Sequence, residues 1–274
     1  MIKIDKPLVS VGWLKENLKA PNLIILDGTI PKVTSNQEIA NEVQIPNSRF
    51  FDIKKKFSDV NALFPNTVPS AAQFTIEAQK LGINQDTAIV VYDDKGIYSS
   101  ARVWFLFKAF GHDNVAVLDG GLPEWIANGY AVVEKQFREV ERGDFIGTYN
   151  SEYFKFFDDI KIILTNNSYQ ILDARSRDRF ESLVTEPRAG LRSGNIPNSK
   201  NLPFNALLNR NCMKSENELK KILSSFDINN KKLVFSCGSG ITACILALAS
   251  EIAGYNNFSV YDGSWTEYGT LTDA

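Results

Sequence analysis

The sequence predicts an α/β protein made of two copies of one domain, each copy a parallel sheet flanked by helices. Three observations lead to this prediction. Short apolar runs alternate with helical patterns along the chain, which is typical of βαβ units. Four segments of the first half recur in the second half. The 274 residues leave room for two domains of roughly 150 residues each.

The repeat consists of four pairs of segments in the same order. They are LIILDG at 23–28 with QILDA at 170–174, IPNS at 45–48 with IPNS at 196–199, AIVVYD at 88–93 with KLVFSC at 232–237, and LDGGLPEW at 118–125 with YDGSWTEY at 261–268. The last three pairs are offset by 151, 144 and 143 residues. Because the order and the spacing are both kept, we interpret the chain as a duplicated domain.

The second copy shows the expected elements most clearly. Its predicted strands are residues 170–173, 201–203, 232–236 and 258–261. Between the last two strands, apolar side chains recur at helical spacing and predict a helix packed on the sheet. These positions are Ile241, Cys244, Ile245, Leu248 and Ile252.

A polar run separates the two copies. This run, residues 134–144, has the composition of a surface segment. We therefore expect a first domain at 1–137, a linker at 138–153 and a second domain at 154–274.

The charge balance and the single histidine argue against several classes of function. The chain has 30 Lys and Arg against 32 Asp and Glu, a formal net charge of -2. This leaves no basic excess to neutralise a phosphate backbone, so we expect no nucleic acid partner. The only histidine, His112, follows the helical pattern of the first copy and is expected at the surface. A zinc site built from histidines and a Ser-His-Asp triad are therefore not expected.

We expect a cytoplasmic protein without a membrane partner. The N-terminal residues 1–19 lack the apolar core of a signal peptide, and no run of about 18 apolar residues occurs. Three cysteines, Cys212, Cys237 and Cys244, include no CxxC pair, which argues against a disulfide framework and a zinc cluster. We expect no metal, and one of the three thiols is the candidate for chemistry.

The segment 232–249 is the most informative part of the chain. A strand ends at Ser236, Cys237 follows, and Gly238-Ser239-Gly240 leads into a helix. Two glycines permit positive φ angles, so that amides can point at one centre, and the helix N-terminus adds its own donors. This pattern favours a reactive thiolate at Cys237 over a merely buried cysteine. Ser239 is either a hydrogen-bond donor or only a small residue that fits.

The other cysteines have different interpretations. Cys244 lies on the apolar stripe of the predicted helix and is expected in the core. Cys212 lies in a polar segment and is expected to be incidental. A Cys-dependent phosphatase would need an arginine six positions after the nucleophile, where this chain has Ala243, so phosphate chemistry is not expected.

The duplicated layout and the CGSGIT loop at 237–242 resemble the tandem-domain rhodanese superfamily, most closely its 3-mercaptopyruvate sulfurtransferases. The resemblance extends from residues 9–14 to residues 261–265. It implies two rhodanese-like domains, with Gly238, Gly240, Ile241 and Thr242 binding the substrate around Cys237 and Ser239. Thiosulfate-specific members have a basic residue in this loop, which this chain lacks.

The resemblance also assigns two arginines. Arg179, in DARSRDRF at 173–180, and Arg188, in EPRAG at 186–190, match residues that bind the substrate carboxylate and carbonyl. A planar guanidinium is a natural partner for a small α-keto acid. The alternative is that both are surface arginines paired with Asp178 and Glu186.

The first copy is expected to lack catalytic activity. Asp93 occupies the position of Cys237, and an acid cannot hold a sulfane sulfur. By resemblance, Tyr98 lines the cleft between the domains. Lys54 and Ala62 are expected where the family has the acid and the histidine of a Ser-His-Asp proton relay through Ser239, so two relay members are missing.

The expected activity is transfer of sulfane sulfur from 3-mercaptopyruvate, through a persulfide on Cys237, to a thiophilic acceptor, with release of pyruvate and without a cofactor. The acceptor is cyanide or a thiol, such as a thioredoxin-like protein or a low-molecular-weight thiol. Two alternatives remain open. One is a thiosulfate sulfurtransferase, and the other is a persulfide-binding module with little turnover.

Overall fold

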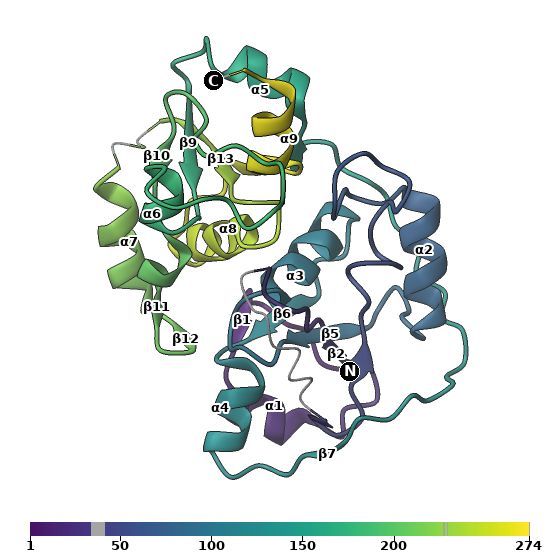
Figure 1. The fold of residues 1–274 in the computed structure, drawn as a ribbon. Coiled ribbons are helices and arrows are strands. Elements are labelled where there is room, and N and C mark those ends of the chain that lie inside the picture. Colours follow the sequence, from purple (N-terminus) through teal and green to yellow (C-terminus); the bar gives the residue numbers. More distant parts are fainter. Residues whose placement is uncertain (34–41, 227, 229, 274) are drawn as a thin grey trace.

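Two five-stranded parallel sheets form the frame of the molecule (Figure 1). The computed structural model describes residues 1–33, 42–226, 228 and 230–273. The first sheet has the order β1(Leu8–Val9), β6(Val115–Leu118), β5(Ala88–Tyr92), β2(Leu23–Asp27), β4(Arg49–Phe50). The second has the order β10(Lys200–Asn201), β9(Tyr169–Asp173), β13(Lys232–Ser236), β14(Phe258–Tyr261), β8(Phe154–Lys155).

The two sheets have the same topology, which confirms the predicted α/β fold and the duplication. Strand β5 pairs with β2 and β6 in the first sheet, and β13 pairs with β9 and β14 in the second, all in parallel. The two IPNS segments also form the same turn. Asn47 and Asn198 have φ angles of 65° and 60°, and in each turn the serine amide donates to the isoleucine carbonyl over 3.1 Å. Proline followed by a left-handed residue is typical of a type II turn.

Helices cover the sheets and connect their strands. In the first domain they are α1(Val11–Asn17), α2(Ala71–Lys80), α3(Ser100–Ala109) and α4(Gly121–Ala127). In the second they are α5(Phe157–Ile163), α6(Arg177–Phe180), α7(Glu216–Ser224), α8(Ala243–Ile252) and α9(Ser264–Leu271), with a 3-10 turn, η1(Phe204–Leu207). Two short antiparallel pairs complete the list: β3(Val43–Gln44) with β7(Val133–Glu134), and β11(Leu208–Asn209) with β12(Cys212–Met213).

The sequence places most of these elements correctly. The expected helix after β13 is α8, although it begins at Ala243 and leaves Ile241 in the preceding loop. The expected strand at 201–203 is the shorter β10, because Pro203 has no amide to donate to a neighbouring strand. The domain boundaries at 138 and 153 stay a prediction; β7 ends at Glu134 and β8 begins at Phe154.

The domains pack against each other through α3 and α8 (Figure 1). A single apolar cluster extends across this contact. In it, Phe105 of α3 lies with its ring centroid 5.2 Å from that of Phe154 in the second domain. This packing brings loops of the first domain to the carboxyl edge of the second sheet.

His112 is not at the surface, and that expectation was wrong. Its side chain is 3% exposed, and Nε2 donates to the carbonyl of Thr87 over 2.9 Å. The rings of Phe107 and Phe145 lie 5.7 and 5.4 Å away. Burial lowers the pKa of His112, so the imidazole is neutral and structural.

Candidate active site

Cys237 lies directly after the central strand of the second sheet. Its residue is 2% exposed, and it follows β13 at the edge where β9 and β14 also end. The loop of residues 237–242 begins here and leads into α8. In open parallel sheets, ligands bind at this carboxyl edge. The predicted nucleophile is therefore in the position where the fold places chemistry.

The N-terminus of α9 fixes the conformation of this loop. Ser264 Oγ accepts hydrogen bonds from the amides of Cys237 and Gly240, over 3.1 and 3.2 Å. The carbonyls of Cys237 and Gly238 accept from the amides of Trp265 and Thr266, each over 3.0 Å. Sequence reasoning missed this role of Ser264, although it lies in the repeated segment 261–268. The loop is held from both sides before any ligand binds.

The two glycines of the loop are needed for different structural reasons. Gly240 has a φ of +74°, and a Cβ there would lie 2.5 Å from the carbonyl oxygen of Asp262. Gly238 does not have a positive φ, so that part of the expectation was wrong. A Cβ on Gly238 would lie 3.1 Å from Arg179 Nη2 and 3.5 Å from Arg188 Nη1. Gly238 therefore leaves room for two guanidinium groups at the loop.

The two arginines differ in their partners. Arg188 Nη2 donates to Ser239 Oγ over 2.8 Å. Arg179 forms a bidentate pair with Glu186, with Nε and Nη2 at 3.2 and 2.5 Å from its two oxygens. Of the two ion pairs considered as the alternative, the Arg179–Glu186 pair is thus present. Burial lowers the pKa of Arg188, and the nearby Arg179 lowers it further. Arg188 is thus a partly desolvated cation at the loop.

The first domain contributes Asn66 to the site, which sequence reasoning missed. Asn66 is 4% exposed, and its Nδ2 donates to Ser239 Oγ over 2.9 Å and to Ser239 O over 3.0 Å. Ala62, expected at the relay position, has no such contact and is only half-buried. The prediction of Ala62 rests on the apolar-proline pair Phe64-Pro65 that follows it. The pair Val68-Pro69 follows Asn66 at the same spacing and is the signal that could have indicated Asn66.

Lys54 and Tyr98 of the first domain are within electrostatic range of this site. Partial desolvation lowers the pKa of Lys54, and the charge of Arg188 lowers it further. Burial raises the pKa of Tyr98 to about 12, with further increases from Cys237 and Asp93 and opposing effects of the arginines. Tyr98 is therefore within electrostatic range of Cys237, and its place in the substrate cleft stays a prediction.

The remaining two cysteines are unreactive by their surroundings. Burial raises the pKa of Cys244 to about 12 and that of Cys212 to about 11. Cys244 is fully buried in α8, as predicted. Cys212 packs against Gly120, whose added Cβ would lie 2.8 Å from its sulfur. Cys244 lies beside Arg102 of the first domain, whereas Arg179 and Arg188 lie against Gly238, the residue after Cys237, which leaves Cys237 as the candidate nucleophile.

A family model described as "Rhodanese-like domain" matches residues 10–128 and 157–270. These two matches cover most of the chain and correspond to its two sheets. The chain belongs to the rhodanese family.

Similar proteins of this family match over nearly the whole chain. The Arabidopsis thaliana protein "Thiosulfate/3-mercaptopyruvate sulfurtransferase 1, mitochondrial" is 37% identical, over 99% of this chain and 78% of its own length. The 3-mercaptopyruvate sulfurtransferase of Escherichia coli K12 is 34% identical, over 97% and 95%. The crystal structure of SseA from Escherichia coli superposes with a TM-score of 0.85 at 31% identity, covering 95% of this chain and 99% of that one. The cytoplasmic location stays a prediction.

The first rhodanese domain has a carboxylate in place of the thiol. Asp93 follows β5 as Cys237 follows β13, and its Oδ2 accepts from the amides of Tyr98, Ser99 and Ser100 over 2.8–2.9 Å. Its Oδ1 accepts from the amide of Lys95 over 2.9 Å. In this fold, the loop and the following helix N-terminus therefore surround an anion with backbone donors.

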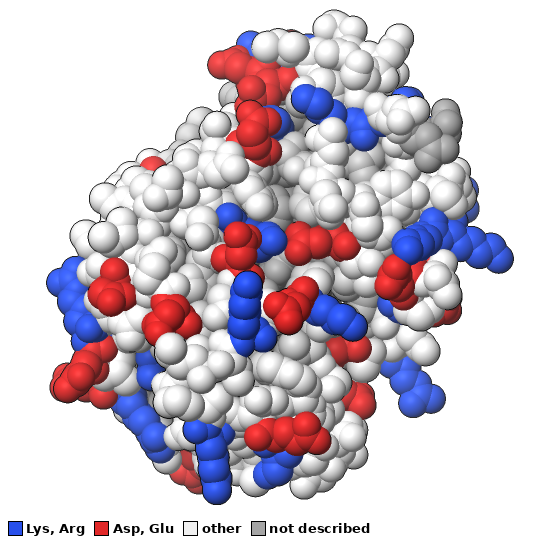
Figure 2. Space-filling model, turned by 180° about the vertical axis from the view of Figure 1, so that it is seen from behind, with Lys and Arg blue, Asp and Glu red and all other residues white. Residues whose placement is uncertain are grey.

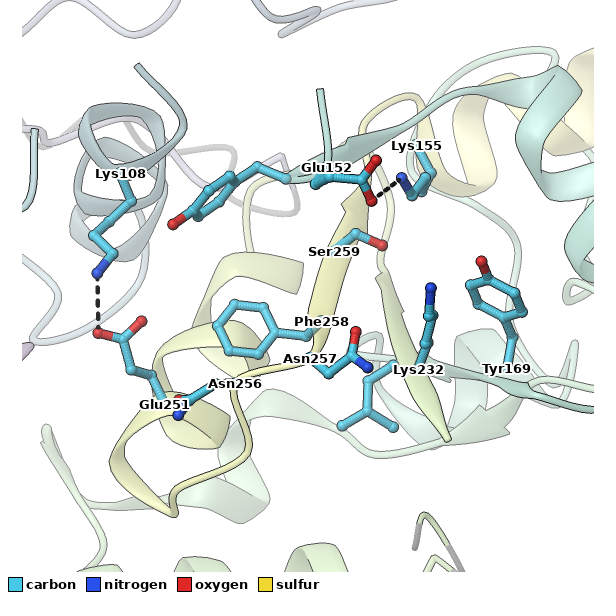
Figure 3. Close-up of a pocket in the computed structure, with 12 residues that line it drawn as sticks. Lys108, Glu152, Lys155, Tyr169, Lys232, Glu251, Asn256, Asn257, Phe258 and Ser259 are labelled. Carbon is cyan, nitrogen blue, oxygen red and sulfur yellow. Dashed lines mark hydrogen bonds and ion pairs between the residues drawn. The ribbon is translucent and has the colours of Figure 1, made fainter. Parts of the chain in front are cut away.

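Two cavities lie away from the loop of residues 237–242. One, of about 520 Å³, lies at the amino ends of β9, β13 and β14, where Lys108 pairs with Glu251 and Lys155 with Glu152 (Figure 3). The other, of about 940 Å³, lies in the first domain between 44–57 and 135–140. None of the predicted site residues lines either cavity. Seen from behind, basic and acidic side chains are interspersed on the surface (Figure 2).

No helix in the described part of the chain is long and apolar enough to cross a membrane. Among the same residues there is also no group of three or more His, Cys, Asp or Glu side chains that could hold a metal ion.

Proposed function

We propose that this protein is a sulfurtransferase that moves sulfur from 3-mercaptopyruvate to a thiophilic acceptor through a persulfide on Cys237. The observation that supports it most is the placement of two guanidinium groups at the Cys237 loop. Nitrogens of Arg179 and Arg188 lie 3.1 and 3.5 Å from the Cβ position that Gly238 leaves empty. These groups suit a donor with a carboxylate beside a ketone. Relatives of similar length bear the same activity in their names.

The first half of the reaction loads Cys237. Its thiolate attacks the sulfur of 3-mercaptopyruvate, an S–S bond forms, and the C–S bond breaks. The electron pair of the C–S bond stays with the organic fragment as the enolate of pyruvate. The transferred sulfur brings its hydrogen, so the protonated persulfide can lose the proton that the enolate carbon gains. Charge and atoms balance without a redox partner.

The loop then holds the anionic persulfide. Asp93 in the first domain shows how such a loop surrounds a negative group, since three successive amides bind one carboxylate oxygen. The corresponding part of the second domain includes Ile241, at 5% exposure, and Thr242, the residue before α8. Backbone donors stabilise an anion without adding an acid that would protonate it.

The second half of the reaction unloads Cys237. A thiolate or cyanide attacks the outer sulfur, the S–S bond breaks, and Cys237 returns as a thiolate. The product is a new persulfide or thiocyanate. We propose a thiol as the biological acceptor, either a low-molecular-weight thiol or a thioredoxin-like protein.

A second candidate donor is thiosulfate. Lys54 adds a third cation near Arg188, as its lowered pKa indicates, and thiosulfate is a compact dianion. The Arabidopsis relative has both donors in its name. Against thiosulfate, residues 238–242 of the loop include no basic side chain. Mercaptopyruvate is therefore the preferred donor in our proposal.

A rate comparison tests the proposal. Each donor is supplied with cyanide, and thiocyanate is measured for the wild type, Cys237→Ser and the matched control Cys244→Ser. We expect faster turnover with mercaptopyruvate, none in Cys237→Ser, and near wild-type rates in Cys244→Ser. Mass spectrometry without acceptor should find one added sulfur on Cys237. A preference for thiosulfate would reject the donor, and stable loading without turnover would favour a persulfide-binding module.

A further inference from the structure

The hydrogen-bond partners of Ser239 determine what its hydroxyl can do. Asn66 Nδ2 lies 2.9 Å from Ser239 Oγ and 3.0 Å from Ser239 O. A carbonyl oxygen only accepts, so the atom of Asn66 that faces it is the amide nitrogen, not the oxygen. The same nitrogen must then donate to Ser239 Oγ, because an amide nitrogen has no free lone pair to accept with.

The second neighbour of this hydroxyl is also only a donor. Arg188 Nη2 lies 2.8 Å from Ser239 Oγ, and a guanidinium has no acceptor atom. A hydroxyl oxygen has two lone pairs and one proton. With both lone pairs occupied, the proton of Ser239 must point in the remaining direction, and the structure gives it no acceptor among the residues described.

We propose that Asn66 and Arg188 hold Ser239 as an obligate hydrogen-bond donor to the substrate, so that its hydroxyl binds the keto oxygen while the enolate forms. This rests on the proposed function. In this assignment Ser239 is a catalytic residue and Asn66 is a positioning residue that acts through it. A donor aimed at an oxygen that gains negative charge stabilises the transition state more than the bound substrate.

The surroundings of Asn66 argue against a longer proton relay. Its Oδ1 is buried and has no hydrogen-bond partner within the described part of the chain, so no further group is linked through it. A carboxamide does not titrate near neutral pH. No titrating group is needed to supply a proton, since the sulfur of the donor brings the proton that pyruvate requires.

The backbone of Asn66 is fixed as well. Its φ of 64° is in the left-handed region, which asparagine adopts more readily than most residues. Its carbonyl accepts from Arg102 Nη2 over 2.8 Å, and Arg102 is fully buried. Asn66 is therefore a rigid part of the interface, which a positioning residue requires.

A double-mutant cycle tests this assignment. In Asn66→Asp, a carboxylate of the same shape offers an acceptor and takes the Ser239 proton away from the substrate. We expect Asn66→Asp and Ser239→Ala each to lower kcat with mercaptopyruvate by about tenfold or more, with a smaller change in KM. The double variant should be no slower than Ser239→Ala, because Asn66 acts only through the hydroxyl.

A second variant guards against a folding defect. Asn66→Gly keeps the left-handed backbone but offers no acceptor, so Ser239 can rotate freely and kcat should fall less than in Asn66→Asp. Thermal unfolding of each variant shows whether stability falls in the same order as kcat, as a folding defect alone would require. Losses that multiply in the double variant, or a wild-type kcat in Asn66→Asp, would overturn the role of Ser239. If the wild type itself does not turn over mercaptopyruvate, the proposed function fails first and this assignment with it.

Discussion

Arg102 of α3 and Asp262, the residue after β14, form a buried ion pair across the domain interface. Arg102 Nη2 lies 2.7 Å from Asp262 Oδ1, and their side chains are 0% and 1% exposed. The guanidinium also donates to the carbonyl of Gly240 over 3.3 Å, and Asp262 Oδ2 accepts from the amide of Val68 over 2.7 Å. The domain without a cysteine in its loop thus helps to fix the loop of the other domain.

Breaking this pair should destabilise the protein strongly. In Arg102→Met, the carboxylate of Asp262 loses its cation inside the interface, which typically costs about 3–5 kcal/mol of unfolding free energy. Urea unfolding measures the loss. Glu216→Gln is the matched control, since it breaks an ion pair with Lys220 whose side chains are 59% and 49% exposed, and little change is expected there. Equal losses in both variants would contradict the role of burial.

The two arginines should differ in their effect on the donor. Arg188→Lys loses the planar group that reaches Ser239 and should lower kcat/KM for mercaptopyruvate by about ten- to a hundredfold. Arg179→Lys should lower it less, because Arg179 is already engaged by Glu186, which also pairs with Arg175, whereas Arg188 contacts Ser239. Steady-state rates with both donors measure this, and thiosulfate activity should fall less than mercaptopyruvate activity. A larger loss for Arg179→Lys would reverse the assigned order.

The single histidine gives a pH dependence of stability. Burial lowers the pKa of His112 in the folded state, so below its ordinary value of 6.5 the unfolded chain binds a proton that the folded chain does not. Stability should therefore fall as the pH drops below 6.5, with a slope of up to about 1.4 kcal/mol per pH unit. Denaturant unfolding between pH 7 and 5.5 measures it. His112→Gln should remove most of this slope, and an unchanged slope would assign it to the carboxylates.

The fold and the position of Cys237 at the end of a central strand were predictable because their signals are short sequence patterns. The alternating apolar runs and the Cys-Gly-x-Gly turn lie within short windows of sequence, and the repeat is recognised by comparing short segments with one another. Asn66 was not predictable in this way, since its contact joins residues 173 positions apart across two domains. His112 was misplaced for a related reason. Phe145, from the segment between the domains, packs over it, and nothing near His112 in the sequence indicates this cover.

The loop geometry leads to a last prediction, which separates backbone strain from a steric clash. Gly240 and Gly254 both have a positive φ, +74° and +83°, but a Cβ meets a carbonyl at 2.5 Å only in Gly240. Gly254→Ala has open space and should cost about 1–2 kcal/mol of unfolding free energy, the ordinary strain of a left-handed alanine. Gly240→Ala should cost clearly more.

Activity should separate these two variants further. In Gly240→Ala the added methyl group pushes the Cys237 loop away from Asp262, so the loading of sulfur on Cys237 should fall sharply. In Gly254→Ala it should stay near the wild-type level, because that residue lies after α8, far along the chain from the thiol. Urea unfolding and mass spectrometry after incubation with donor measure the two effects. If both variants lost equal stability and loaded sulfur equally, the close contact of Gly240 with Asp262 would have no functional importance.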